Sequence, residues 1–197
     1  MFKVAGTDRA VPLAAVAKLS YAPMGPSSEL GIGLDGSASF DGIPNFPNGC
    51  HVCEVEVDPA TGAVELVNYV SVDDVGIAIN PLLLDGQIHG GIAQGAGQAL
   101  VESIEYDKSG QLLTGSFLDY AMPRADMFCD IEVGMHNTPT PTNPLGVKGA
   151  GEAGCVGSPP AVINAILDAL APLGVTDIEM PATPERVWRA IQSAGKK

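Results

Sequence analysis

The stretch HVCEVEVDPATGAVELVNYVSV, residues 51–72, predicts a β-hairpin, and this hairpin determines the class of fold that we expect. Before its turn, apolar and acidic residues alternate with the period of two typical of a half-buried strand. In the turn, Asp58-Pro-Ala-Thr-Gly62, proline presets φ and glycine takes the position with positive φ. Glu54 and Glu56 should face solvent, and the buried face should carry Cys53, Val55, Val57, Val64, Leu66, Val70 and Val72.

A glycine-rich segment after the hairpin predicts a helix. The sequence GQIHGGIAQGAGQAL, residues 86–100, places Ile88, Ile92 and Ala96 at helical spacing. The same segment holds five glycines, each of which costs about 1 kcal/mol relative to alanine inside a helix. Glycines at this density indicate that something approaches the backbone closely, either a neighbouring strand or a ligand.

The remaining elements complete a mixed α+β fold. Short strands are expected over 102–106 and 111–114, around a turn at 107–110, and a further strand over 130–135. A long loop over 137–154 leads to Ser158-Pro-Pro160, which predicts a helix start with serine as the N-cap. Thr183-Pro-Glu185 predicts a last helix through Gln192, burying Val187, Trp188 and Ile191.

The chain is expected to divide near residue 50. Residues 1–49 are rich in proline, glycine and serine, which predicts an irregular N-terminal arm with one short helix near 13–19. Residues 50–197 hold the periodic segments and are expected to form the main domain.

Charge and composition exclude several classes of function. The net charge is −13, and no lysine or arginine occurs between Leu19 and Asp107. A nucleic-acid binder needs a basic surface, and a membrane-surface helix needs basic residues on its polar face, so neither partner is expected. No apolar run of about 18 residues is apparent. The low share of charged residues, 17%, suggests that other protein covers part of the surface.

The cysteines do not predict a disulfide framework or a metal site. Four cysteines at uneven spacing favour a reducing, cytoplasmic compartment. Cys50-His-Val-Cys53 is a CxxC motif, but a zinc site would need a second pair of ligands, which the sequence lacks. A redox dithiol is possible, although the strand pattern favours Cys53 as a buried structural residue.

The loop before the predicted helix start contains the sequence GAGEAG, residues 149–154, which matches the dinucleotide motif GxGxxG. An NAD-binding domain would need a strand before this motif and a helix that begins inside it, and we expect neither here. Glu152, between the glycines, is either a solvated loop residue or a carboxylate aimed into a site. Apolar surroundings would raise its pKa and suit a general base.

Three segments in order resemble a known family. They are VDDVGIAINP (72–81), GQIHGGIAQGAGQAL (86–100) and KGAGEAG (148–154), the last followed by SPPAV (158–162). Together they resemble the C-terminal part of the molybdopterin-binding large subunit of the xanthine dehydrogenase and aldehyde oxidase family. The similarity is greatest to the bacterial branch with carbon-monoxide-dehydrogenase-like large subunits.

The resemblance implies roles for particular residues. Glu152 would be the general base beside molybdenum, and Gln87 would hydrogen-bond the pterin. Lys148, Gly149 and Gly151 lie in the matching loop and are expected to contribute to cofactor binding. Asp73 and Asp74 match a motif whose role is structural or in cofactor packing. The cofactor would be molybdenum–molybdopterin in its cytosine dinucleotide form, and the glycines of residues 86–97 would let the backbone approach it.

The resemblance also implies partners. Iron–sulfur clusters and FAD would sit on a small and a medium partner subunit, and the complete enzyme would be a dimer of heterotrimers. Its substrate would be a small molecule, an aldehyde, N-heterocycle or similar electrophilic carbon compound, hydroxylated with water as the oxygen source. Family large subunits are several times longer than 197 residues, so we expect this chain to need the remainder of a large subunit and to be inactive alone. The alternative is a non-catalytic structural or assembly module that retains the family fold.

Overall fold

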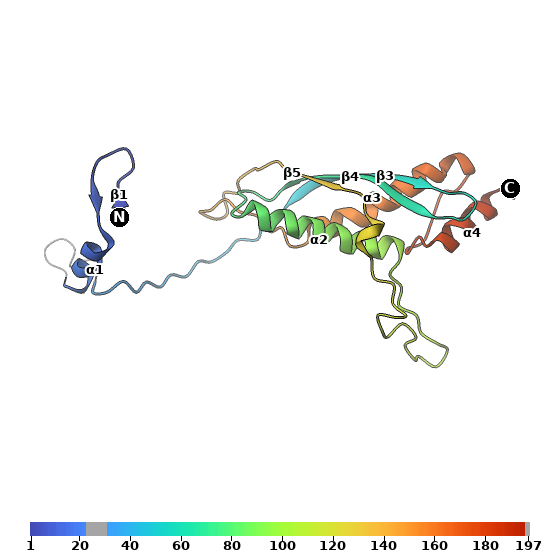
Figure 1. The fold of residues 1–197 in the computed structure, drawn as a ribbon, viewed down its shortest axis with the longest axis horizontal. Coiled ribbons are helices and arrows are strands. Elements are labelled where there is room, and N and C mark those ends of the chain that lie inside the picture. Colours follow the sequence, from blue (N-terminus) through green and yellow to red (C-terminus); the bar gives the residue numbers. More distant parts are fainter. Residues whose placement is uncertain (23–30, 196–197) are drawn as a thin grey trace. The chain divides into compact units, whose positions relative to one another are not determined.

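The computed structural model describes residues 1–22 and 31–195, which form two compact units, Met1–Asp41 and Gly42–Lys197 (Figure 1). In the first unit, β1 (Phe2–Lys3) pairs with β2 (Ala10–Val11) and is followed by α1 (Leu13–Tyr21). The short helix predicted near residues 13–19 is therefore confirmed. No residue of α1 is buried, so this unit contributes little core of its own.

The larger unit is built on a three-stranded sheet in the order β3-β4-β5. The antiparallel strands β3 (Asn48–Val57) and β4 (Val64–Asp74) are the predicted hairpin. Strand β5 (Ile131–Met135), also predicted, runs parallel to β4. A parallel neighbour needs a crossover connection, and the chain between β4 and β5 contains the helix α2 (Pro81–Leu100). The mixed α+β fold is confirmed.

A β-bulge corrects the predicted buried face of the second strand. The register shifts so that Glu54 pairs with Asn68 but Val55 pairs with Leu66, leaving Val67 as the extra residue. Beyond the bulge the alternation changes phase, so Tyr69, Ser71 and Asp73 point inward and Val72 is 42% exposed. The prediction that Val70 and Val72 share the buried face with Leu66 was therefore wrong.

The helices α2 and α3 (Ala153–Leu170) pack together and cover one face of the sheet. Gly91 meets Gly154, and Gly95 meets Ser158, so the two helices advance in the same direction. A Cβ on Gly91 would lie 2.9 Å from the Cys155 amide nitrogen, which explains why glycine is needed there. At Gly91 and Gly95 the close neighbour is a helix, which is neither of the two alternatives, a strand or a ligand, that the sequence left open. A Cβ on Gly86 or Gly90, by contrast, would meet nothing within 4 Å.

Helix α3 begins five residues before the predicted start at Ser158. Pro159 and Pro160 lie inside the helix, and Ser158 is buried with its hydroxyl donating to the Ile92 carbonyl at 3.1 Å. The serine serves the contact between helices rather than a cap. With its 3-10 extension η3 (Ala171–Leu173), this segment is long and apolar enough to cross a membrane by length and composition. The segment is not a continuous apolar run, because it contains Asn164 and Asp168, and its buried residues pack against α2 and the sheet.

The C-terminal helix α4 (Pro184–Ala194) starts as predicted, with Thr183 accepting from the Arg186 amide. Val187 is buried, but Trp188 is 41% exposed, contrary to prediction. The two strands predicted around the turn at 107–110 are reduced to a single bridge between Tyr106 and Leu112. A short 3-10 helix, η2 (Ala125–Met127), precedes β5.

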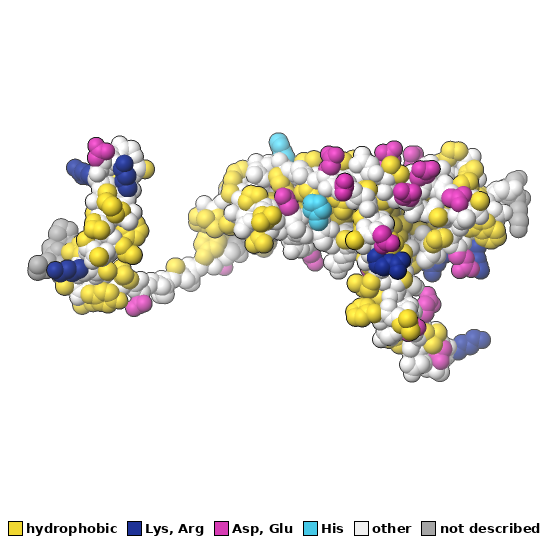
Figure 2. Space-filling view, viewed as in Figure 1, with side chains coloured by type: hydrophobic (Ala, Val, Ile, Leu, Met, Phe, Trp, Pro, Cys, Tyr) yellow, Lys and Arg dark blue, Asp and Glu magenta, His cyan; other side chains and the backbone are white. Residues whose placement is uncertain are grey.

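The outward face of the sheet carries part of the negative charge. Exposed acidic side chains occur on all three strands, at Glu54, Glu56, Glu65 and Glu132. Figure 2 shows acidic groups spread along the sheet side of the larger unit. The core lies on the opposite face, between the strands and the two long helices.

Candidate active site

The glycine loop and the start of α2 meet, which brings two predicted site residues together. The Gln87 side-chain amide donates a hydrogen bond to the Gly151 carbonyl at 2.8 Å. Glu152 is the next residue along the loop. Gln87 and Glu152, 65 positions apart in the chain, therefore lie at one site.

Glu152 occupies the N-cap position of α3, but its side chain makes no capping hydrogen bond. The Glu152 carbonyl accepts from the Val156 amide at 2.9 Å, so its backbone is fixed to the first turn of the helix. The side chain itself is exposed. This chain alone therefore does not supply the apolar surroundings that the sequence-based argument for a general base invoked.

A hollow of about 330 Å³ lies beside Glu152. It is lined by the segment leading into β3, the end of β4 and the first turns of α3. Among its lining residues are Phe46, Pro47, His51, Asp73, Glu152 and Val156. The hollow therefore combines an apolar wall with two carboxylates and an imidazole, a composition suited to holding a small organic molecule.

His51 and Asp73, which both line this hollow, form a buried polar pair that the sequence did not predict, although Asp73 matched a family motif with a structural or cofactor-packing role. His51 Nε2 lies 3.4 Å from Asp73 Oδ1, and His51 Nδ1 lies 2.8 Å from the Tyr69 hydroxyl. Burial raises the pKa of Tyr69, which keeps its proton. Among the described residues, Asp73 Oδ2 and Ser71 Oγ are buried without a hydrogen-bond partner.

Two glycines create the space for this pair. A Cβ on Gly157 would lie 2.5 Å from His51 Nδ1, and a Cβ on Gly49 would clash with the Asp73 carboxylate. After the bulge, Tyr69, Ser71 and Asp73 lie on the buried face of β4, which is what brings Asp73 to His51. Predicting this arrangement would require the position of the bulge, and the local alternation of residue types does not reveal it.

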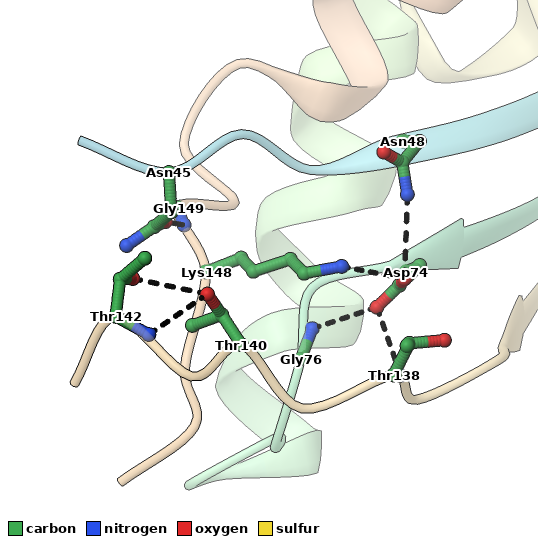
Figure 3. Close-up of polar contacts among 9 residues, drawn as sticks. All are labelled: Asn45, Asn48, Asp74, Gly76, Thr138, Thr140, Thr142, Lys148 and Gly149. Carbon is green, nitrogen blue, oxygen red and sulfur yellow. Dashed lines mark hydrogen bonds and ion pairs between the residues drawn. The ribbon is translucent and has the colours of Figure 1, made fainter. Parts of the chain in front are cut away.

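Asp74 connects four segments (Figure 3). Its Oδ2 lies 2.7 Å from Lys148 Nζ and accepts from Asn48 Nδ2 at 3.3 Å. Its Oδ1 accepts from the backbone amides of Gly76 at 2.9 Å and Thr138 at 3.0 Å. The Lys148 ammonium, followed by these two amides, holds the pKa of Asp74 far below its ordinary value.

The other predicted cofactor residues have distinct surroundings. The Lys148 ammonium is engaged by Asp74 and only 12% of its side chain is exposed. The Gly149 amide donates to Asn45 Oδ1 at 3.2 Å. A Cβ on Gly149 or Gly151 would meet nothing within 4 Å, so both present uncovered backbone. Cofactor binding by these residues and by Gln87 stays a prediction.

Of the two cysteines in the CxxC motif, only Cys53 has the surroundings expected of a structural residue. Burial, with Cys129 nearby, raises the pKa of the Cys53 thiol to about 12, whereas Cys50 is exposed. Within residues 1–22 and 31–195, no three metal-ligating side chains cluster.

One of the two arguments against the dinucleotide motif was wrong. Helix α3 begins at Ala153, inside the glycines, whereas we expected a later start. The other argument holds, because the described residues before the motif form a loop with only an isolated bridge between Val147 and Gly76. The strand that a Rossmann unit needs there is absent.

Comparison with known proteins identifies the fold and the family. A family model described as a molybdopterin cofactor-binding domain matches residues 1–128. The chain is 46% identical over 159 residues to the nicotine 6-hydroxylase large subunit of Paenarthrobacter nicotinovorans, covering 80% of this chain and 20% of that subunit. It is 37% identical over 194 residues to the carbon monoxide dehydrogenase large chain of Hydrogenophaga pseudoflava, covering 97% of this chain and 24% of that one.

The structure agrees with these sequence matches. A solved structure of reconstituted CO dehydrogenase from Oligotropha carboxidovorans superposes with a TM-score of 0.84 at 34% identity, over 92% of this chain and 22% of that chain. The chain therefore belongs to the family of molybdopterin cofactor-binding domains. Within it, the chain is a member of the large-subunit group of xanthine dehydrogenases and carbon monoxide dehydrogenases, which are molybdopterin-dependent oxidoreductases. It spans less than a quarter of the length of the two relatives compared above.

Proposed function

We propose that this chain supplies the general base and part of the cofactor site of a molybdenum hydroxylase. The observation that carries the proposal is the position of Glu152, whose exposed carboxylate stands at a hollow and whose loop is tied to Gln87. The substrate would be an aldehyde, an aromatic N-heterocycle or a similar compound with an electrophilic carbon. The 46% identity to a nicotine 6-hydroxylase favours an N-heterocycle among these.

The residues present are suited to a bulky cofactor. Gly86 and Gly90 are one helical turn apart, and the space over both is open, as it is over Gly149 and Gly151. Gln87 lies beside them and uses one amide hydrogen on Gly151, so the described residues leave its other polar positions available. These residues would hold molybdopterin, in the cytosine dinucleotide form by our proposal. When bound, this cofactor supplies the two-electron oxidation that hydroxylation by water requires.

The role of the chain's own residues follows from their placement. The Glu152 carboxylate would accept the proton released as water-derived oxygen adds to the substrate carbon, a contribution of about 10²–10⁴-fold for a positioned base. Phe46 and Val156 line the hollow but are largely exposed in this chain, so the remainder of a large subunit would have to cover them to limit access of bulk water. Gln87 would orient both the cofactor and the loop.

The proposal also includes the rest of the large subunit and the partner subunits. The remainder of a large subunit would complete the site, and iron–sulfur and FAD subunits would carry the electrons away in a cytoplasmic dimer of heterotrimers. On its own, the chain would be inactive and would retain far less than one molybdenum per chain.

The test is Glu152→Gln in the complete enzyme, with molybdenum content measured by mass spectrometry alongside turnover. We expect full molybdenum content and at least about a hundredfold loss of kcat. Glu132→Gln, which neutralises an exposed glutamate on β5, is the matched control and should change neither. Turnover that survives in the Glu152 variant would remove this residue from the mechanism and favour the assembly-module alternative.

A further inference from the structure

We propose that Asp74 and Lys148 are a pair of positioning residues that fix the glycine loop carrying Glu152. This inference rests on the proposed function of Glu152 as the base. Neither residue would touch substrate or take part in proton transfer. Their role would be to hold residues 148–152 in one conformation, so that the carboxylate stands at the hollow.

The first argument is the number of segments that end on one carboxylate. Asp74 receives hydrogen bonds from the start of β3, from its own turn and from the segment after β5, through Asn48, Gly76 and Thr138 (Figure 3). Lys148 Nζ, at 2.7 Å, is the fourth partner and the only one that belongs to the glycine loop. This contact fixes the glycine loop to the end of strand β4.

The second argument is that the loop is anchored on both sides of Glu152. On the N-terminal side, the Lys148 amide donates to the Val75 carbonyl at 2.8 Å, so both the backbone and the side chain of Lys148 are fixed to the end of β4. Closer to Glu152, Gln87 holds the Gly151 carbonyl. On the C-terminal side, Glu152 joins the first turn of α3. Residues between these anchors are glycine or alanine, which impose little conformation themselves.

The third argument is burial, which gives this ion pair more weight than a surface pair. The side chains of Lys148 and Asp74 are each 12% exposed. Removing one partner leaves the other charge poorly solvated, so the loop should shift to reach water. The pair Arg189 and Glu185 on α4, at 2.6 Å but about 70% exposed, lacks this property and provides a matched control.

The experiment is a double-mutant cycle in the complete enzyme with Lys148→Met, Asp74→Asn and both together. Two readouts are needed: amide hydrogen exchange of residues 145–152 in cofactor-free protein, and kcat with molybdenum content in loaded protein. We expect each single variant to accelerate exchange of the loop at least about tenfold and to lower kcat between tenfold and a hundredfold, since small misplacements of a reacting group have effects of this size. Molybdenum content should be retained.

The cycle separates positioning from direct cofactor binding. If the pair acts as a unit, the double variant should be no worse than the more impaired single variant. Lys148→Arg, which keeps the charge, should recover part of kcat. Asp74→Asn keeps an acceptor for Gly76 and Thr138, so it should still fold. Arg189→Met and Glu185→Gln should leave loop exchange and kcat unchanged.

Three outcomes would overturn the inference. Unchanged loop exchange in both single variants would refute the positioning role. Loss of molybdenum in Lys148→Met with a normal Asp74→Asn variant would make Lys148 a direct cofactor ligand instead. Accelerated loop exchange with unchanged kcat would support the anchoring of the loop but refute the claim that this anchoring positions Glu152 for turnover, whereas the role of Glu152 itself is tested by Glu152→Gln.

Discussion

The contact between α2 and α3 predicts opposite effects for two alanine substitutions on one helix. Gly95 faces α3, where a new Cβ would clash with the Ser158 hydroxyl and lie 2.8 Å from the Cys155 carbonyl oxygen. Gly90 lies five residues earlier on the same helix, and a Cβ there would meet nothing within 4 Å. The two positions therefore separate helix propensity from helix packing.

The magnitudes follow from these surroundings. Gly90→Ala should raise the free energy of unfolding by about 1 kcal/mol, the propensity difference between glycine and alanine in a helix. Gly95→Ala gains the same propensity term but overpacks a tight contact, at a cost of about 1–3 kcal/mol. It also disturbs the hydrogen bond from Ser158 to Ile92, worth about 1 kcal/mol. We expect a net destabilisation of about 2 kcal/mol.

Urea unfolding followed by circular dichroism, on the purified protein and each variant, measures both changes. The difference between the two variants should be about 3 kcal/mol, which is well above the error of the method. Thermal midpoints should move in opposite directions by a few degrees. If both variants stabilise the protein, the helices do not approach as described. If both destabilise it, the surface at Gly90 is covered, contrary to the open space there.

Two further predictions use the perturbed pKa values. Asp74 has a lowered pKa when folded, so its stabilisation is present at neutral pH and is lost as the pH falls below about 4, the ordinary aspartate range. The difference in unfolding free energy between the unsubstituted protein and the Asp74→Asn variant should therefore shrink as the pH falls below about 4. A difference that stays constant with pH would contradict the ion pair. Cys53, with a pKa of about 12, should resist iodoacetamide at pH 8, whereas exposed Cys50 should react. Peptide mass spectrometry measures both, and equal labelling would argue against burial of Cys53.

Sequence reasoning succeeded where short-range chemistry decides the structure. The hairpin followed from alternation around Asp58-Pro-Ala-Thr-Gly62, and the start of α4 followed from Thr183 and Pro184. These features depend on residues within a few positions of one another. The family motifs also predicted that Gln87 and Glu152 belong to one site. The hydrogen bond from Gln87 to Gly151 brings the two residues near each other, and their roles stay predictions.

The errors arose where long-range packing overrides local preference. Ser158 and the prolines after it have the chemistry of a helix start, yet the contact with Ile92 uses that serine inside α3. The bulge at Val67 changed which residues of β4 are buried, so the pair of His51 and Asp73 was missed. Asp74 and Lys148 are 74 positions apart, and nothing near either one indicates the other.

The start of α3 has a consequence for how sequence variation in this family should be read. Glu152 is the first residue of a segment whose next turns contain Gly154, Gly157 and Ser158, which fit against α2 and His51. Substitutions at these three positions would displace the carboxylate without touching any ligand. Invariance across residues 149–158 would therefore reflect two separate selective pressures, one on the chemistry of Glu152 and one on the packing that holds it in place. A redesign of substrate preference should leave Gly154, Gly157 and Ser158 intact and alter wall residues such as Phe46 and Val156.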